Sequence, residues 1–168
     1  EKDFKSALDY TLKVIVQYNV DAVVLGLPKN MDVEWSHFGS GPLFSELELL
    51  AESLPDNVKF KFYGFVSNKE LMLIYKNKKP NAFINVSSSE GIPVSIMEAM
   101  SFGVPVIATD VGGTSEIVNH ENGVLLSSNP TMPEIASSIL SFTKESTLEE
   151  KSLRAYSTWQ ENYHAEKN

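Results

Sequence analysis

The chain has 168 residues, a hydrophobic content of 42% and a net charge of −8. This length is sufficient for one hydrophobic core, so we expect a single globular domain. The acidic balance argues against nucleic acid as a partner, because binding to a phosphate backbone needs a basic surface. The absence of cysteine excludes disulfides and thiolate metal sites, and it favours a cytoplasmic location.

The N-terminal part of the chain has an ambiguous pattern. Apolar residues between 4 and 15 recur with helical spacing, and residues 22–27 read either as a strand or as a continuation of that helix. The first residues run directly into the helical pattern, which suggests that the chain is part of a longer protein. No apolar run approaches the ~18 residues that span a membrane, so we expect a soluble chain.

From residue 32 onward, strand-like and helical runs alternate. Strands are predicted at 33–38, 58–65, 81–87, 104–110 and 123–128, and helices at 42–54, 68–78, 93–102, 114–120 and 132–144. A terminal helix is expected at 147–165, packed over the sheet or toward a neighbouring domain. The strands are nearly continuous in Val, Ile and Phe, as in parallel strands covered on both faces. The pattern therefore predicts an α/β fold with a doubly wound parallel sheet.

The helix predicted after the third of these strands has residues typical of a helix boundary at both ends. Pro93 suits its first position because proline has no N–H to lose, and Gly103 suits the residue after its last turn. The start of this helix follows the carboxyl end of a strand, where open α/β sheets bind ligands. Because Gly91 has no Cβ, a ligand can approach its backbone, and the helix N-terminus is predicted to seat a phosphate.

Two glutamates flank this predicted phosphate seat. Glu90 precedes it, and Glu98 lies about five residues into the helix, or ~7.5 Å along the axis. A carboxylate aimed at a phosphate would repel it, so both are better suited to accept hydrogen bonds from sugar hydroxyls on either side of a diphosphate. The alternative, to which spacing alone gives equal weight, is that Glu90 caps the helix and Glu98 is a solvated surface residue.

The run "EGIPVSIMEAMSFGVPVIATDVGGTSEIV" resembles the donor-site motif of the family-4 glycosyltransferases, which are retaining enzymes with a GT-B fold. Glu90 and Glu98 match the two glutamates of that motif, and residues 103–108 and 112–118 match its glycine-containing segments. "FGSGPLFSELELLA" and "VKFKFYGFVSNKEL" are similar to two further donor-site loops. The resemblance implies that residues 1–168 are the C-terminal, Rossmann-like donor-binding half of a GT-B fold, with the N-terminal acceptor domain absent.

The same resemblance implies roles for individual residues. Glu98 would accept from the ribose hydroxyls, and Glu90, the catalytic candidate, would contact the transferred sugar. Lys2 matches the lysine that contacts the diphosphate, although the family's partner arginine would precede this chain. The backbone near Val66 would meet the base. The remaining donor-binding candidates line the sugar and phosphates or the first glycine loop: Gly91, Ile92, Pro93, Gly39, Ser40 and Gly41.

Other motifs have simpler interpretations. Gly39 to Pro42 could be only a strand-to-helix turn, but its expected place on the edge that carries Glu90 favours ligand contact. Ser67 and Glu70 form a capping-box pattern, which explains both without chemistry. The three histidines lack ligand spacing, and no metal site or cofactor is predicted.

The expected function is transfer of a hexose from a nucleotide-diphosphate sugar, with a UDP-sugar favoured, to a glycan or lipid-linked acceptor in polysaccharide biosynthesis. The resemblance allows a peripheral location of the full-length protein at the inner face of the membrane. The fragment alone is expected to bind nucleotide weakly and to transfer nothing. The alternatives are a nucleotide-sugar epimerase or hydrolase of the same architecture, and a non-catalytic sugar-nucleotide binding module.

Overall fold

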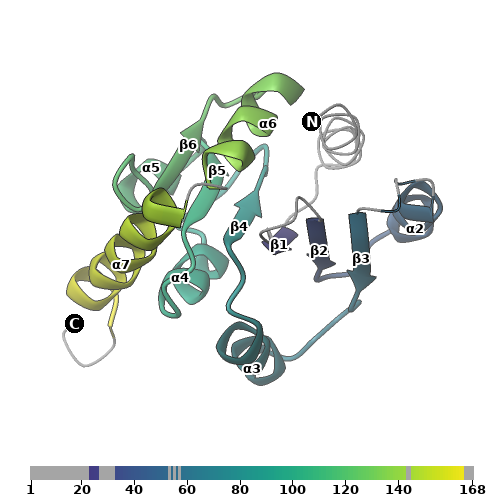
Figure 1. Ribbon diagram of the computed structural model, residues 1–168, viewed down its shortest axis with the longest axis horizontal. Coiled ribbons are helices and arrows are strands. Elements are labelled where there is room, and N and C mark those ends of the chain that lie inside the picture. The colour runs from purple at the N-terminus through teal and green to yellow at the C-terminus, as the bar shows by residue number, and fades with distance from the viewer. Residues whose placement is uncertain are drawn as a thin grey trace.

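A computed structural model describes residues 23–26, 33–52, 54, 56, 58–142 and 145–164. Within them, six strands and six helices alternate (Figure 1). The strands are β1 (Val23–Gly26), β2 (Val33–His37), β3 (Val58–Phe62), β4 (Ala82–Asn85), β5 (Val106–Thr109) and β6 (Gly123–Leu126). The helices are α2 (Phe44–Glu52), α3 (Asn68–Lys78), α4 (Val94–Met100), α5 (Thr114–Ile117), α6 (Met132–Ser141) and α7 (Glu145–Asn162).

The strands form one sheet in the order β3-β2-β1-β4-β5-β6, which runs across Figure 1. Strand β2 pairs parallel with β3, and β4, β5 and β6 pair parallel with one another. These pairings confirm the predicted α/β class. Residues 22–27, which the sequence left open between helix and strand, include β1.

The direction of β1 departs from the predicted all-parallel sheet. It pairs antiparallel with both of its neighbours, β2 and β4. The link from β1 to β2 comprises only residues 27–32, whereas a parallel crossover needs about a dozen residues or more. A short link between neighbouring strands therefore joins them as an antiparallel pair.

The reversal of β1 leaves the other five strands pointing the same way, because β2 and β4 both oppose β1. The carboxyl ends of β2, β3, β4 and β5 consequently lie along one edge of the sheet. The loops that follow them contain Gly39, Val66, Gly91 and Gly112, respectively. The four loops therefore open on a common edge, which is the position of ligand sites in open α/β folds. This confirms the expected place of the Gly39 loop on the edge that carries Glu90.

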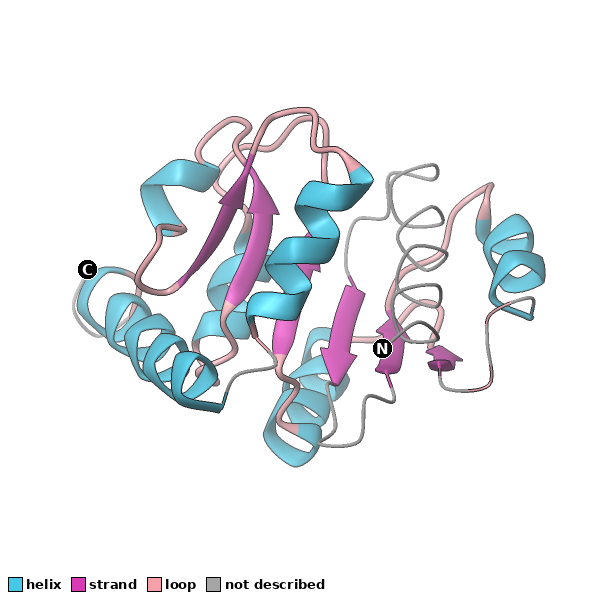
Figure 2. Ribbon diagram, turned by 45° about the horizontal axis from the view of Figure 1, so that its top comes forward, coloured by secondary structure: helices cyan, strands magenta, loops and turns pink. Residues whose placement is uncertain are grey.

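Both faces of the sheet are covered, as Figure 2 shows. In β4, Ile84 belongs to the core that contains α2 and α6 residues, whereas Phe83 belongs to the core that contains residues of α3, α4, α5 and α7. In β5, Ile107 faces the first core and Val106 the second. Alternation between two buried faces explains why β4 and β5 are apolar at every position but the last.

The helix α4 is shorter than the predicted span of 93–102. Pro93 is its N-cap with an extended conformation, and the helix ends at Met100. Gly103 follows in the left-handed region at φ +68°, as the sequence predicts for the residue after the last turn. Its carbonyl accepts a hydrogen bond of 2.6 Å from Ser152 Oγ, which joins this turn to α7.

The terminal helix α7, drawn in yellow in Figure 1, runs beside α4. It occupies Glu145–Asn162, where the sequence predicts a helix over 147–165. Ala155 is fully buried in the core that also contains residues of α4, while Leu153 remains largely exposed. Among the described residues, no helix is both long and apolar enough to cross a membrane.

Candidate functional site

The loop that carries Glu90 begins where β4 ends. Asn85, the last residue of β4, is buried and donates a hydrogen bond of 3.1 Å from Nδ2 to Glu90 Oε1. Its Oδ1 accepts from the backbone N–H of Ser87 at 3.0 Å. Glu90 is therefore half-buried and held on one carboxylate oxygen, rather than freely solvated.

The loop after β5 packs directly on the Glu90 loop. Gly112 has φ +55°, and a Cβ built on it would lie 1.7 Å from the backbone oxygen of Glu90. The N–H of Gly113 donates to the carbonyl of Gly91 at 3.0 Å. Thr109 adds a hydrogen bond of 2.6 Å from Oγ1 to the carbonyl of Ser87. The glycine pair of the motif thus lets two loops make backbone contact.

Glu98 lies on α4, within the second half of the helix. Its Oε1 accepts a hydrogen bond from Asn68 Nδ2, which joins α4 to the first turn of α3. Burial raises the pKa of the Glu98 carboxyl above its usual value, and the bond from Asn68 lowers it in part. Burial also raises the pKa of Tyr75, with a smaller contribution from the charge of Glu98. Glu98 is therefore a partly buried position of α4 that has a hydrogen-bond partner on α3.

The loops after β2 and β3 are joined to each other at the same edge. Gly39, at φ +115°, donates its N–H to the carbonyl of Gly64 at 2.9 Å, and Tyr63 donates to the carbonyl of His37 at 2.9 Å. Ser40 and Gly41 are exposed, and a Cβ at Gly39 or Gly41 would meet no atom within 4 Å. This segment is a turn that also leaves open space beside it.

Val66 is half-buried against the core on the α3 face. The residue after it, Ser67, is the N-cap of α3 and forms with Glu70 the capping box that the sequence predicts. Phe65, on the other side of Val66, is 86% exposed. The loop therefore offers its backbone and one aromatic ring at the edge, while its polar side chains stabilise the helix.

At the start of α4, the side chains leave the backbone accessible. Gly91 is exposed with open space at its Cβ position, Ile92 is 52% exposed, and Pro93 is buried. Unlike α3 and α6, α4 has no side-chain cap. The backbone N–H groups of its first turn are thus not satisfied by a capping side chain.

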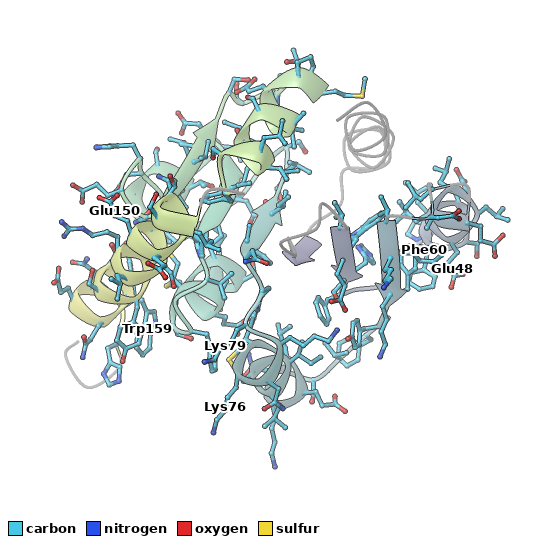
Figure 3. All side chains as sticks on the ribbon, viewed as in Figure 1. Glu48, Phe60, Lys76, Lys79, Glu150 and Trp159 are labelled. Atoms are coloured by element: carbon cyan, nitrogen blue, oxygen red, sulfur yellow. The ribbon has the colours of Figure 1, made fainter. Side chains whose placement is uncertain are left out.

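Lys2, the predicted diphosphate contact, lies outside the described residues. Other lysines gather at the C-terminal end of α3, where Lys76 and Lys79 project away from the helix in Figure 3. Lys78 is paired with Glu34 at 2.9 Å, and this hydrogen bond raises the pKa of the lysine. These cations lie at the opposite end of α3 from Val66 and complement the helix dipole.

Sequence reasoning missed Asn85 and Asn68, which hold the two glutamates. Asn68 and Glu98 are 30 residues apart, so no local pattern links them. For Asn85, one signal was available, because a polar residue ends an otherwise apolar strand at the ligand-binding edge. Among the described residues, no group of three or more His, Cys, Asp or Glu side chains could hold a metal ion.

The family model described as Glycosyl transferases group 1 matches residues 5–158. An uncharacterized glycosyltransferase of Methanocaldococcus jannaschii is 28% identical over 127 residues, which are 73% of this chain and 32% of that protein. A GDP-mannose-dependent alpha-mannosyltransferase of Corynebacterium glutamicum is 30% identical over 127 residues, or 73% of this chain and 29% of that protein. The chain thus spans about a third or less of the length of these curated relatives.

Among solved structures, a TarM variant of S. aureus in complex with Fondaparinux, alpha-GlcNAc-glycerol and UDP is similar with a TM-score of 0.69 and 20% identity. The match covers 97% of this chain and 30% of TarM. This likeness confirms the predicted fold, a Rossmann-like half of a GT-B structure. With the family match over residues 5–158, it leads to one conclusion: this chain belongs to the group 1 glycosyl transferases.

Proposed function

We propose that this chain is the donor-binding domain of a retaining, family-4 glycosyltransferase that moves a hexose from a nucleotide-diphosphate sugar to an acceptor. The observation that carries the proposal is the position of two glutamates. Glu90 and Glu98 flank the start of α4 at the edge where the carboxyl ends of five parallel strands meet, and neither is a capping residue of α4.

In this proposal, Glu98 accepts a hydrogen bond from the ribose. Asn68 donates to its Oε1, which orients the carboxylate and leaves its other oxygen for a hydroxyl. The partial burial that raises the pKa of Glu98 also lowers the local dielectric constant, so a hydrogen bond to the carboxylate is stronger there than in water. The base meets the backbone near Val66.

The diphosphate contacts Gly91, Ile92 and Pro93, where the backbone is accessible and the helix has no side-chain cap. Gly39, Ser40 and Gly41 line the donor from the loop after β2, and Lys2 adds a positive charge. The positive end of the helix dipole and these N–H groups stabilise the negative charge that develops on the departing diphosphate.

Glu90 contacts the transferred sugar. Asn85 fixes one carboxylate oxygen, and the glycine pair after β5 fixes the backbone, so the carboxylate is held before the donor binds. Preorganised groups of this kind lower a barrier because they need no rearrangement during the reaction. We therefore assign Glu90 the catalytic role in this half of the enzyme.

The named relatives support a nucleotide sugar as donor but differ in the base, since one is GDP-mannose-dependent and TarM was solved with UDP. We propose a UDP-sugar as donor and a glycan or lipid-linked compound as acceptor, within polysaccharide biosynthesis. Residues 1–168 form the donor half, and a separate N-terminal domain holds the acceptor. The full-length protein acts in the cytoplasm, at the inner face of the membrane where the acceptor is lipid-linked.

The test is nucleotide release by the full-length protein that contains this chain, with UDP- and GDP-sugars and with or without a glycan or lipid-linked acceptor. Release that depends on the acceptor, together with a glycosylated product, is the expected result. Release without any acceptor would indicate a hydrolase, an altered sugar without release an epimerase, and binding without any reaction a binding module.

A further inference from the structure

Asn85 is a buried amide in a strand whose other side chains are apolar. Strand β4 has the sequence AFIN, and Asn85 is 2% exposed at its carboxyl end. A buried amide is retained in a fold when its donors and acceptors are satisfied. The partners of Asn85 therefore show what this side chain does.

The two ends of the amide have different partners, and together they fix its orientation. Nδ2 donates to Glu90 Oε1 at 3.1 Å, and Oδ1 accepts from the N–H of Ser87 at 3.0 Å. A flipped amide would set its oxygen against the Glu90 carboxylate and its NH₂ group against an N–H donor. Both contacts would then be repulsive, so only the observed orientation satisfies the site.

The backbone of the Glu90 loop has further anchors that do not involve Asn85. Thr109 Oγ1 donates to the carbonyl of Ser87 at 2.6 Å, and the N–H of Gly113 donates to the carbonyl of Gly91 at 3.0 Å. Among the described residues, only Asn85 donates a hydrogen bond to the Glu90 carboxylate. Asn85 also holds the loop backbone through Ser87, but its distinct contribution is the hydrogen bond to the side chain of Glu90.

A glutamate side chain has three torsions, and fixing them costs conformational entropy that one buried donor can offset. We propose that Asn85 is a positioning residue that holds Glu90 Oε1 and thereby aims Oε2 at the transferred sugar. This inference rests on the proposed function of Glu90 as the residue that contacts the sugar. In addition to that function, it makes the reaction depend on the side-chain amide of Asn85, which contacts Glu90 but not the substrate.

The discriminating variant is Asn85→Asp in the full-length protein. It keeps the acceptor for Ser87 but sets a carboxylate against Glu90, and like charges at this distance repel. At neutral pH, we expect turnover to fall roughly tenfold or more, as for loss of a hydrogen bond to a charged group. The affinity for UDP alone should change less than twofold, because Asn85 acts through Glu90, which contacts the sugar and not the nucleotide.

In acid, the added carboxyl of Asn85→Asp takes up a proton and can donate to Glu90. Turnover relative to the wild type at the same pH should therefore recover, whereas Asn85→Leu, which has no donor at any pH, should not recover. Thr109→Val is the matched control, since it removes a bond to the loop backbone alone. It should lower the melting temperature and leave the shape of the pH profile unchanged.

The proposal is overturned if Asn85→Asp has the turnover and pH profile of the wild type. It is also overturned if Thr109→Val lowers turnover at neutral pH and regains it in acid, as expected for Asn85→Asp. A separate readout does not need activity: in the selectively ¹⁵N-labelled full-length protein, the Asn85 side-chain amide should exchange faster with water in Glu90→Ala. An unchanged exchange rate contradicts the contact. A wild-type protein without affinity for nucleotide sugars instead overturns the proposed function, while the exchange measurement still tests Asn85.

Discussion

At the starts of α3 and α6, glutamates take part in capping boxes, whereas the two glutamates around α4 belong to no capping box and are held by asparagine side chains. Glu70 and Glu134 each complete a capping box, with Ser67 and Thr131 respectively. Hydrogen bonds from Ser67 lower the pKa of Glu70. Bonds from Ser127 and Thr131 lower the pKa of Glu134, the backbone of Ser127 contributing most.

Glu98 shows the opposite behaviour. Burial raises the pKa of its carboxyl, so its charged form is disfavoured by the fold. The capping glutamates stabilise the protein as carboxylates, while Glu98 is a carboxylate at some cost to stability. A cost of this kind is expected where a residue is kept for binding rather than for folding. The direction of the pKa shift thus separates Glu98 from the two capping glutamates, Glu70 and Glu134.

Among the variants that test how the glutamates around α4 are held, Gly112→Ala should have the largest effect on stability. The added Cβ would lie 1.7 Å from the backbone oxygen of Glu90, at a residue with φ +55°. We expect a loss of about 3 kcal/mol or more in the free energy of unfolding, from strain and the forced shift of the loop. Denaturant unfolding of the protein measures it.

The control for this variant is Gly91→Val. Gly91 has open space at its Cβ position, so the melting temperature should stay nearly unchanged while nucleotide binding is lost. If both variants destabilise the fold equally, Gly91 is structural and the open helix start is not a ligand contact.

The next effect concerns the catalytic assignment. Glu90→Gln retains the size of the side chain but removes its charge, and we expect turnover of the full-length enzyme to fall about 100-fold, as for other preorganised electrostatic groups. Glu70→Gln, which neutralises a glutamate held within its own capping box, should leave turnover unchanged. Similar losses in both variants would remove the distinction between the two classes of glutamate.

A smaller effect follows from the raised pKa of Glu98. A carboxyl whose pKa is raised on folding contributes stability that is present below its unfolded value and is lost as pH rises through the folded value. Glu98→Gln should therefore be at least as stable as the wild type at neutral pH, and this relative advantage should vanish in acid. Melting temperatures at pH 7 and pH 4 test the sign, and a variant less stable at pH 7 contradicts it.

The smallest effect is expected at α6, on the face opposite α4. Thr131→Ala removes the N-cap and should cost about 1 kcal/mol of stability without any change in nucleotide affinity.

Because the pKa of Glu134 is lowered, the stability that its carboxylate contributes is present above the pKa of the unfolded state and is lost as pH falls through the pKa of the folded state. The difference in the free energy of unfolding between the wild type and Glu134→Gln should accordingly shrink at acid pH. Urea titrations at neutral and acid pH measure it.

The local features of this fold could be predicted from sequence because they depend on neighbours in the chain. The capping box of Ser67 and Glu70, the terminating Gly103 and the alternation of strands and helices belong to this class. The contacts of Asn68 with Glu98 and of Gly112 with Glu90 depend on folding, since they join segments 22 or more residues apart. The antiparallel direction of β1 likewise depends on which strands become neighbours.

The central claim is that Glu98 contacts the ribose and Glu90 the transferred sugar, and one set of calorimetric titrations tests it directly. The full-length wild type, Glu98→Ala and Glu90→Gln are titrated with UDP, 2′,3′-dideoxy-UDP and a UDP-sugar. A charged hydrogen bond is worth about 1.5–3 kcal/mol. Glu98→Ala should therefore lower the affinity for UDP by tenfold or more and leave the affinity for the dideoxy nucleotide almost unchanged. Glu90→Gln should remove only the difference in affinity between the UDP-sugar and UDP. Equal losses for all three ligands in both variants would contradict this assignment.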